Sequence, residues 1–88
     1  LFKHSTACPV SWTAHAQVTR FLKHNASVPV YLVPVIRERV LSRAIADRTG
    51  VRHESPQVIL IRKGVAADSA SHGEITEGVL AGMLTQCR

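Results

Sequence analysis

Residues 5–12 read STACPVSW, and this stretch predicts the point where a strand ends and a helix begins. Pro9 suits the first turn of a helix, because proline lacks a backbone N–H and its fixed φ matches the helix. Residues 1–4 read as the visible end of a strand. Apolar residues then recur at helical spacing as far as residues 24–25, namely Val10, Ala14, Val18, Phe21 and Leu22. Cys8 is therefore expected at a strand-to-helix junction, directly before the first turn.

The middle of the chain predicts a second strand and a second helix. Val30–Val33 is short and rich in β-branched residues, so it reads as a buried strand that Pro34 ends. Arg37–Thr49 has the helical period, and Gly50 follows it as a C-terminal cap. The helix face expected to be buried carries Val40, Leu41, Ala44 and Ile45.

The last third of the chain predicts a hairpin and a closing helix. Gln57–Arg62 reads as a strand, and Lys63-Gly64 offers a tight turn into a second strand, VAADSA, over residues 65–70. The two strands are therefore expected to be antiparallel. The closing helix follows SHGE, despite the weak helix formers Gly78 and Gly82, and its apolar positions are Ile75, Val79, Leu80, Met83 and Leu84. The predicted order is β-α-β-α-β-β-α.

Length and cysteine content bound the class of protein. A chain of 88 residues that is 45% hydrophobic is expected to form one domain, residues 1–88, with a single modest core. Two cysteines, Cys8 and Cys87, do not make the disulfide framework of a small secreted protein, which favours a reducing compartment, the cytoplasm. The sequence contains neither an apolar run of membrane-spanning length nor a signal peptide, so a soluble chain is expected. Leu1 already reads as part of a strand, which indicates that a short leading segment is missing.

The charge of the chain points to small anions rather than to nucleic acid. Eleven Lys and Arg against six Asp and Glu give a net charge of +5. The basic residues are scattered, whereas a nucleic-acid surface favours a basic stripe with interleaved aromatic residues. We therefore expect solvated charge with a mild preference for anionic ligands, and no nucleic-acid or membrane partner.

Cys8 is the strongest candidate for chemistry in the sequence. A thiol at a helix N-terminus faces unpaired backbone N–H groups and the positive end of the helix dipole, and both favour the thiolate. Lys3 and His4 add positive potential nearby. The alternative is that Cys8 is a small buried hydrophobic residue, the commoner fate of a lone cysteine.

The element order, with a cysteine at the start of the first helix and Ser-Pro before the third strand, resembles the thioredoxin-like fold in its short glutaredoxin form. That resemblance implies an α/β domain whose central four-stranded mixed sheet is flanked by helices. More narrowly, FKHSTACPVS, GVRHESPQVILI and SASHGEIT resemble the monothiol bacilliredoxin family, small bacterial proteins that act on bacillithiol mixed disulfides. The three blocks span nearly the whole chain, in the order that the family has them.

The resemblance implies a thiol–disulfide oxidoreductase in which the Cys8 thiolate takes bacillithiol from a protein and yields it to a second thiol. Serine at position 11 cannot close an internal disulfide with Cys8, and we expect its hydroxyl to donate a hydrogen bond to the thiolate. The alternative is that Ser11 is a first-turn helix residue without chemistry. Cys87 is expected to be an incidental thiol.

The resemblance also implies the substrate contacts. Thioredoxin-like proteins place a cis-proline opposite the cysteine, which predicts a cis Ser55–Pro56 bond and a pairing of the Ser55 backbone with an extended substrate. Backbone N–H groups and Ser71 in the loop of residues 69–74 are expected to receive the two carboxylates of bacillithiol, with His72 or Lys3 helping to neutralise them. The full set of expected contacts is Lys3, His4, Pro9, His53, Ser55, Pro56, Ser71 and His72.

Five histidines raise the possibility of a metal site, but they lie on several elements without a C-x-x-C or a tight His pair. We therefore expect no metal and no bound cofactor. The expected partners of a monomer are bacillithiol, as co-substrate, and S-bacillithiolated proteins. A carrier of an iron–sulfur cluster or another non-enzymatic thiol-binding module is the alternative function, since some monothiol glutaredoxins bridge a cluster through a C-x-x-S site.

Overall fold

A four-stranded mixed sheet forms the centre of the computed structural model, which describes residues 1–86. The strand order is β2-β1-β3-β4. The β1–β2 pair is parallel, whereas the β1–β3 and β3–β4 pairs are antiparallel. The strands span Phe2–His4 (β1), Leu32–Pro34 (β2), Gln57–Arg62 (β3) and Val65–Ser71 (β4). The expected α/β architecture with a mixed sheet is confirmed.

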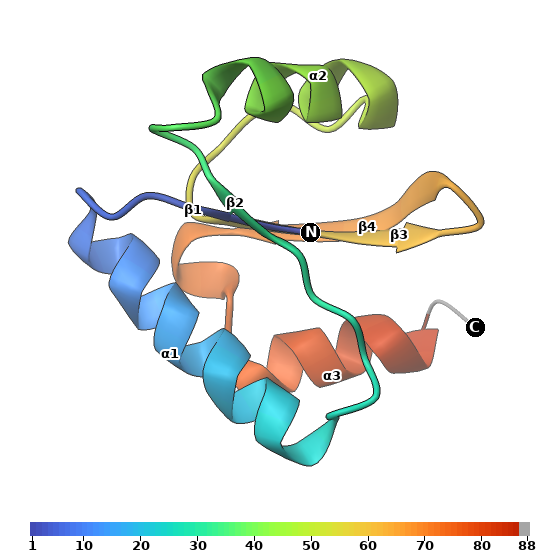
Figure 1. Cartoon of the computed structure of the whole chain (residues 1–88). Coiled ribbons are helices and arrows are strands. Elements are labelled where there is room, and N and C mark those ends of the chain that lie inside the picture. Colours follow the sequence, from blue (N-terminus) through green and yellow to red (C-terminus); the bar gives the residue numbers. More distant parts are fainter. Residues whose placement is uncertain (87–88) are drawn as a thin grey trace.

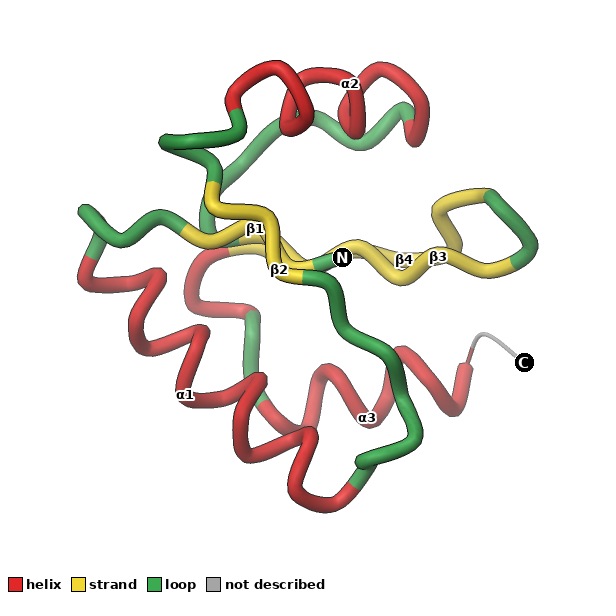
Figure 2. The backbone as a smooth tube through the Cα atoms, in the orientation of Figure 1, coloured by secondary structure: helices red, strands yellow, loops and turns green. Residues whose placement is uncertain are grey.

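Helices cover both faces of this sheet. The helices α1 (Pro9–His24) and α3 (Glu77–Gln86) pack on one face, and α2 (Arg39–Thr49) lies over the other (Figure 1). A short 3₁₀ helix, η1 (His72–Glu74), connects β4 to the segment before α3. Figure 2 shows the loop of residues 50–56 running back beneath α2 to the sheet end where β3 begins. No helix within residues 1–86 has the length and apolar character needed to cross a bilayer.

The main core lies between the sheet and the α1/α3 layer. Successive residues of a strand point to opposite faces, so Phe2 enters this core while Lys3 points toward α2. The buried core residues are Phe2, Ala14, Val18, Phe21, Ala70, Ile75, Leu80 and Met83. The α2 face of the sheet is more polar, because Lys3 and Gln57 are both buried there.

Most element boundaries agree with the sequence predictions. The helix α1 spans Pro9–His24, and Gly50 caps α2 in the left-handed conformation with φ 72°. Lys63 and Gly64 both have positive φ, 54° and 79°, as a tight hairpin requires. The second helix begins at Arg39 rather than at residue 37, because the N–H groups of residues 37 and 38 donate to the carbonyl of Pro34 in a turn.

The predicted apolar face of α2 is wrong, whereas that of α1 is wrong at Val10 and confirmed at Ala14, Val18 and Phe21. On α2, Val40 is 84% exposed and Leu41 46%, while the buried residue is Ser42, whose carbonyl accepts a hydrogen bond from Lys3. On α1, Val10 is 45% exposed and Ser11 is completely buried. The first buried position of α1 is thus occupied by a serine, Ser11, and the buried residue of α2 is a serine as well, Ser42. Val79 of the closing helix is also exposed.

Candidate active site

Cys8 is the N-cap residue of α1 and has a half-buried free thiol. Its carbonyl accepts hydrogen bonds from the N–H groups of Ser11 and Trp12 at 3.0 and 3.3 Å, which starts the helix. Pro9 has no N–H, and the N–H of Val10 lies in the first turn, where no intrahelical acceptor exists. The first turn also contains no acidic residue. The thiol therefore lies at the positive end of the helix dipole.

Ser11 joins the end of β1 to α1. Its Oγ lies 2.7 Å from Nδ1 of His4 and accepts a hydrogen bond of 2.9 Å from the N–H of Ser5. Within residues 1–86 it forms no hydrogen bond to Cys8, so the predicted bond from Ser11 to the thiolate is not present. The hydroxyl is instead used to hold the loop that carries the cysteine. The role of Ser11 in preventing an internal disulfide with Cys8 stays a prediction.

His4 lies in an aromatic cluster beside Ser11. Its ring contacts Trp12 edge-on at 4.6 Å between centroids and His15 at 5.2 Å. Burial lowers the pKa of His4, the charge of His15 lowers it further, and the hydrogen bond with Ser11 opposes this shift. His4 Nε2 is buried without a hydrogen-bond partner among the described residues. The neutral ring is therefore the form that the fold stabilises.

The pKa of His4 makes stability depend on pH. A folded pKa below the ordinary 6.5 means that the unfolded chain binds a proton that the folded chain does not. Stability should be complete above about pH 7 and fall as the pH drops through the range below the unfolded value. Asp and Glu stay ionised down to about pH 5.5, so urea midpoints between about pH 7.5 and 5.5 report on the histidines and on the Leu1 amino group, whose pKa burial also lowers. We expect the midpoint to decrease, and His4→Phe to reduce this slope; a midpoint that rises on acidification contradicts the prediction.

The Ser55–Pro56 peptide bond is cis, as the resemblance predicts. The β1–β3 register pairs Phe2 with Val58 and Lys3 with Gln57, and its continuation places Pro56 beside His4. The carbonyl of Pro56 accepts a hydrogen bond of 2.9 Å from the N–H of His72. The proline loop thus adjoins the strand end that leads to Cys8. Ser55 Oγ is buried and has no hydrogen-bond partner within residues 1–86.

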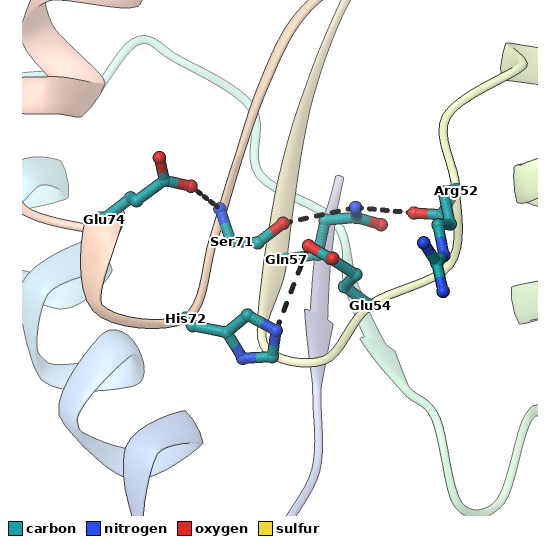
Figure 3. Close-up of polar contacts among 6 residues, drawn as sticks. All are labelled: Arg52, Glu54, Gln57, Ser71, His72 and Glu74. Atoms are coloured by element: carbon teal, nitrogen blue, oxygen red, sulfur yellow. Dashed lines mark hydrogen bonds and ion pairs between the residues drawn. The ribbon is translucent and has the colours of Figure 1, made fainter.

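A polar network connects the proline loop to the turn after β4 (Figure 3). Gln57 Nε2 donates to the carbonyl of Arg52 at 2.9 Å and to Ser71 Oγ at 3.3 Å. The Ser71 N–H donates to Glu74 Oε1 at 3.2 Å. The Ser71 N–H therefore already donates to Glu74, and its hydroxyl accepts from Gln57. These bonds do not favour the capture of a substrate carboxylate by Ser71, which stays a prediction.

His72 extends this network to the surface. Its Nε2 lies 3.9 Å from Glu54 Oε2, and both side chains are exposed. Its backbone has φ 52°, a left-handed conformation in which histidine is enriched among non-glycine residues. Because Glu54 faces the ring, His72 has a carboxylate neighbour of its own, and its predicted contact with bacillithiol would compete with that ion pair.

Lys3 does not lie with the thiol. It is completely buried on the α2 face, where Nζ donates to the carbonyl of Ser42 at 3.0 Å and lies 3.0 Å from Nδ1 of His53. A buried ammonium cannot touch a substrate carboxylate, so the structure does not support direct contact by Lys3. His53 lies on this face too, where its Nδ1 contacts both Lys3 and Ser42. Ser42 is their common partner, and it could not be predicted because these contacts join residues far apart in the chain.

Residues 1–86 contain no group of three or more His, Cys, Asp or Glu side chains close enough to hold a metal ion. Cys87 lies outside the described residues. Pro9 thus follows Cys8 directly, Ser11 in the same first turn lies within hydrogen-bond distance of His4, and the cis-proline loop precedes β3, which pairs with β1. Trp12 and His15 were not predicted as site residues, although Trp12 follows Cys8 by four residues and His15 follows Ser11 by four, a spacing that places each pair on one helix face.

Comparisons with known proteins agree with this geometry. The family model for "Monothiol bacilliredoxin BrxC" matches residues 1–80. A solved structure described as "A putative oxidoreductase with a thioredoxin fold" is 37% identical to the chain, with a TM-score of 0.87. The match covers 94% of this chain and 73% of that chain. The residues that the family model matches include the cysteine, the cis-proline loop and the hairpin, and the chain belongs to the monothiol bacilliredoxin family with a thioredoxin fold.

Proposed function

We propose that this protein is a thiol–disulfide oxidoreductase that removes bacillithiol from protein mixed disulfides through Cys8. The observation that carries the proposal is a free, half-buried thiol at the N-cap of α1, in a chain whose Ser55–Pro56 bond is cis. A thiolate, and not a thiol, is the nucleophile in disulfide exchange, and the helix N-terminus favours that form.

The reaction proceeds by two thiol–disulfide exchanges. The Cys8 thiolate attacks the bacillithiol sulfur of the mixed disulfide, the old S–S bond breaks, and the substrate protein leaves as a thiolate that takes a proton from water. The new disulfide joins Cys8 to bacillithiol. A second bacillithiol thiolate then attacks the bacillithiol sulfur, which releases bacillithiol disulfide and returns Cys8 as a thiolate. The second bacillithiol thiol is thus the reductant of the substrate protein, while the first bacillithiol passes from one disulfide to the next and ends in bacillithiol disulfide.

The surroundings of Cys8 suit a sulfur that must leave as a thiolate when an external thiol attacks the bacillithiol bound to it. The helix N-terminus stabilises the departing Cys8 thiolate in the second exchange, which makes Cys8 a good leaving group. The backbone of Ser55, in the loop beside β1, is the proposed partner of the extended substrate. Trp12, half-exposed and held by a hydrogen bond from Nε1 to the carbonyl of Thr6 at 3.0 Å, offers an apolar wall on the other side.

Intact-mass analysis after treatment with bacillithiol disulfide tests the proposal. In a Cys87→Ser background we expect the mass to increase by one bacillithiol group, located on Cys8 by peptide mapping. Dithiothreitol should reverse the increase. A chain that stays unmodified while a small thiol such as free cysteine reacts under the same conditions would refute the function. Visible absorption of the purified protein would instead favour the iron–sulfur alternative.

A further inference from the structure

An open cavity of about 320 Å³ lies between α2 and the loops that precede and follow it. Its lining consists of Val35, Ile36, Arg39, Arg43 and His53. Within the described residues, no carboxylate contributes to this lining. Arg39 and Arg43 are four residues apart on α2, so their side chains share one helix face. The volume lies at the lower end of the roughly 300–1,000 Å³ typical of small-molecule sites.

A further positive charge, that of Lys3, lies next to His53 of the cavity lining. Lys3 is completely buried and contacts the Ser42 carbonyl and His53 Nδ1, each at 3.0 Å. Neither partner carries a negative charge, and none of the ion pairs formed within residues 1–86 includes Lys3. Burying an ammonium without an opposite charge is costly, so an anion nearby would stabilise this arrangement.

The contact with Lys3 also fixes how His53 faces the cavity. An ammonium can only donate, so Nδ1 of His53 is the acceptor, and the neutral ring carries its proton on Nε2. Ser42 Oγ lies 3.2 Å from the same Nδ1. The Nε2–H is therefore the donor that this ring can offer to a ligand in the cavity.

The charges around His53 come from three elements. Burial lowers the pKa of His53, and the positive charges of Lys3 on β1 and Arg43 on α2 lower it further. Glu54, on the same loop, opposes this shift. The positive potential that disfavours the imidazolium favours an anion at the same place.

We propose that this cavity binds a small oxyanion, a carboxylate or phosphate group, between the guanidinium groups of Arg39 and Arg43 and the Nε2–H of His53. Guanidinium forks match both groups by paired hydrogen bonds. The Val35 N–H donates to the carbonyl of His4 at 3.0 Å, so the cavity wall adjoins the strand that leads to Cys8. The oxyanion is either free in solution or carried by a disulfide substrate. The site itself does not depend on the proposed function.

Nuclear magnetic resonance of the full chain tests the site directly. Added malate or inorganic phosphate should shift the His53 ring signals in a saturable manner, and saturating malate should raise the pKa of His53. Arg43→Gln should weaken binding by about tenfold or more, since a charge-assisted hydrogen bond is lost. Arg48→Gln is the matched control, because it removes the same charge from the same helix outside the cavity. The absence of a saturable shift with either probe, or equal weakening by both substitutions, overturns the proposal.

Kinetics with two disulfides distinguish the sources of the oxyanion. If the substrate carries it, Arg43→Gln should raise KM for bacillithiol disulfide but not for the uncharged bis(2-hydroxyethyl) disulfide. If the oxyanion is free, malate and phosphate binding should weaken while KM for both disulfides stays constant. Both results support the site. A failure of Cys8 to react would refute the proposed function and leave the binding result unaffected.

Discussion

Replacing Cys8 with serine should abolish removal of bacillithiol, lowering kcat/KM by at least about 10³-fold, because the hydroxyl cannot attack a disulfide. The fold should survive, since Cys8 is half-buried and its side chain makes no capping hydrogen bond. The measurement is the rate at which a bacillithiolated model protein loses its adduct, followed by intact mass in the presence of excess bacillithiol. Circular dichroism of the variant establishes that it is folded.

Cys87→Ser is the matched control for this experiment, because it removes the other sulfur of the chain. Its rate should stay within about twofold of the native rate, because the proposed reaction uses no sulfur of the chain other than that of Cys8. If Cys8→Ser retains activity and Cys87→Ser loses it, the reactive sulfur is Cys87 and the assignment of the site at the start of α1 is wrong.

Ser11→Cys should change the outcome of the reaction from a stable adduct to an internal disulfide. Position 11 lies one helical turn from Cys8, where Cβ atoms are about 5–6 Å apart. A disulfide needs about 3.5–4.5 Å, so the first turn must tighten modestly. In a Cys87→Ser background, treatment with bacillithiol disulfide should leave one bacillithiol group on the chain that keeps Ser11. The Ser11→Cys chain should carry no bacillithiol and should have two hydrogens fewer than its own reduced form.

Ser11→Ala separates the reaction from the structural role of Ser11. It should keep the adduct on Cys8 but lower the free energy of unfolding by about 1–3 kcal/mol, since the His4 ring and the Ser5 N–H lose a buried partner. Urea denaturation at neutral pH measures this loss. An adduct that persists equally in Ser11→Cys would show that position 11 does not determine the reaction type, and an unchanged stability in Ser11→Ala would contradict the structural role.

The predictable part of the fold followed from local signals. Proline at the start of α1, glycine at the end of α2 and the Lys63-Gly64 turn each act within a few residues, and all three boundaries agree with the structure. The cis state of Ser55–Pro56 was available only through the family resemblance, because most X-Pro bonds are trans. The position of Cys8 at the helix start followed from the proline that comes after it.

The parts that could not be predicted depend on contacts between distant residues. The apolar residues of α2 suggested that Val40 and Leu41 face the sheet, but the buried Lys3 binds the Ser42 carbonyl and that face is polar. Periodicity assigns apolar residues to the inside and has no means of anticipating a buried lysine. The contact between Ser11 and His4 could not be predicted either, because periodicity does not place two polar side chains together in the interior.

The three residues of β1 leave a protein engineer no neutral position in this strand. Phe2 fills the core between the sheet and the helices α1 and α3, and shortening it to alanine would cost about 3–5 kcal/mol. His4 contacts Ser11 in the first turn of α1, and Lys3 supplies the positive charge next to the α2 cavity. Efforts to stabilise this domain should therefore begin on exposed positions of the helices, such as Val40, where the side chain contributes little to packing.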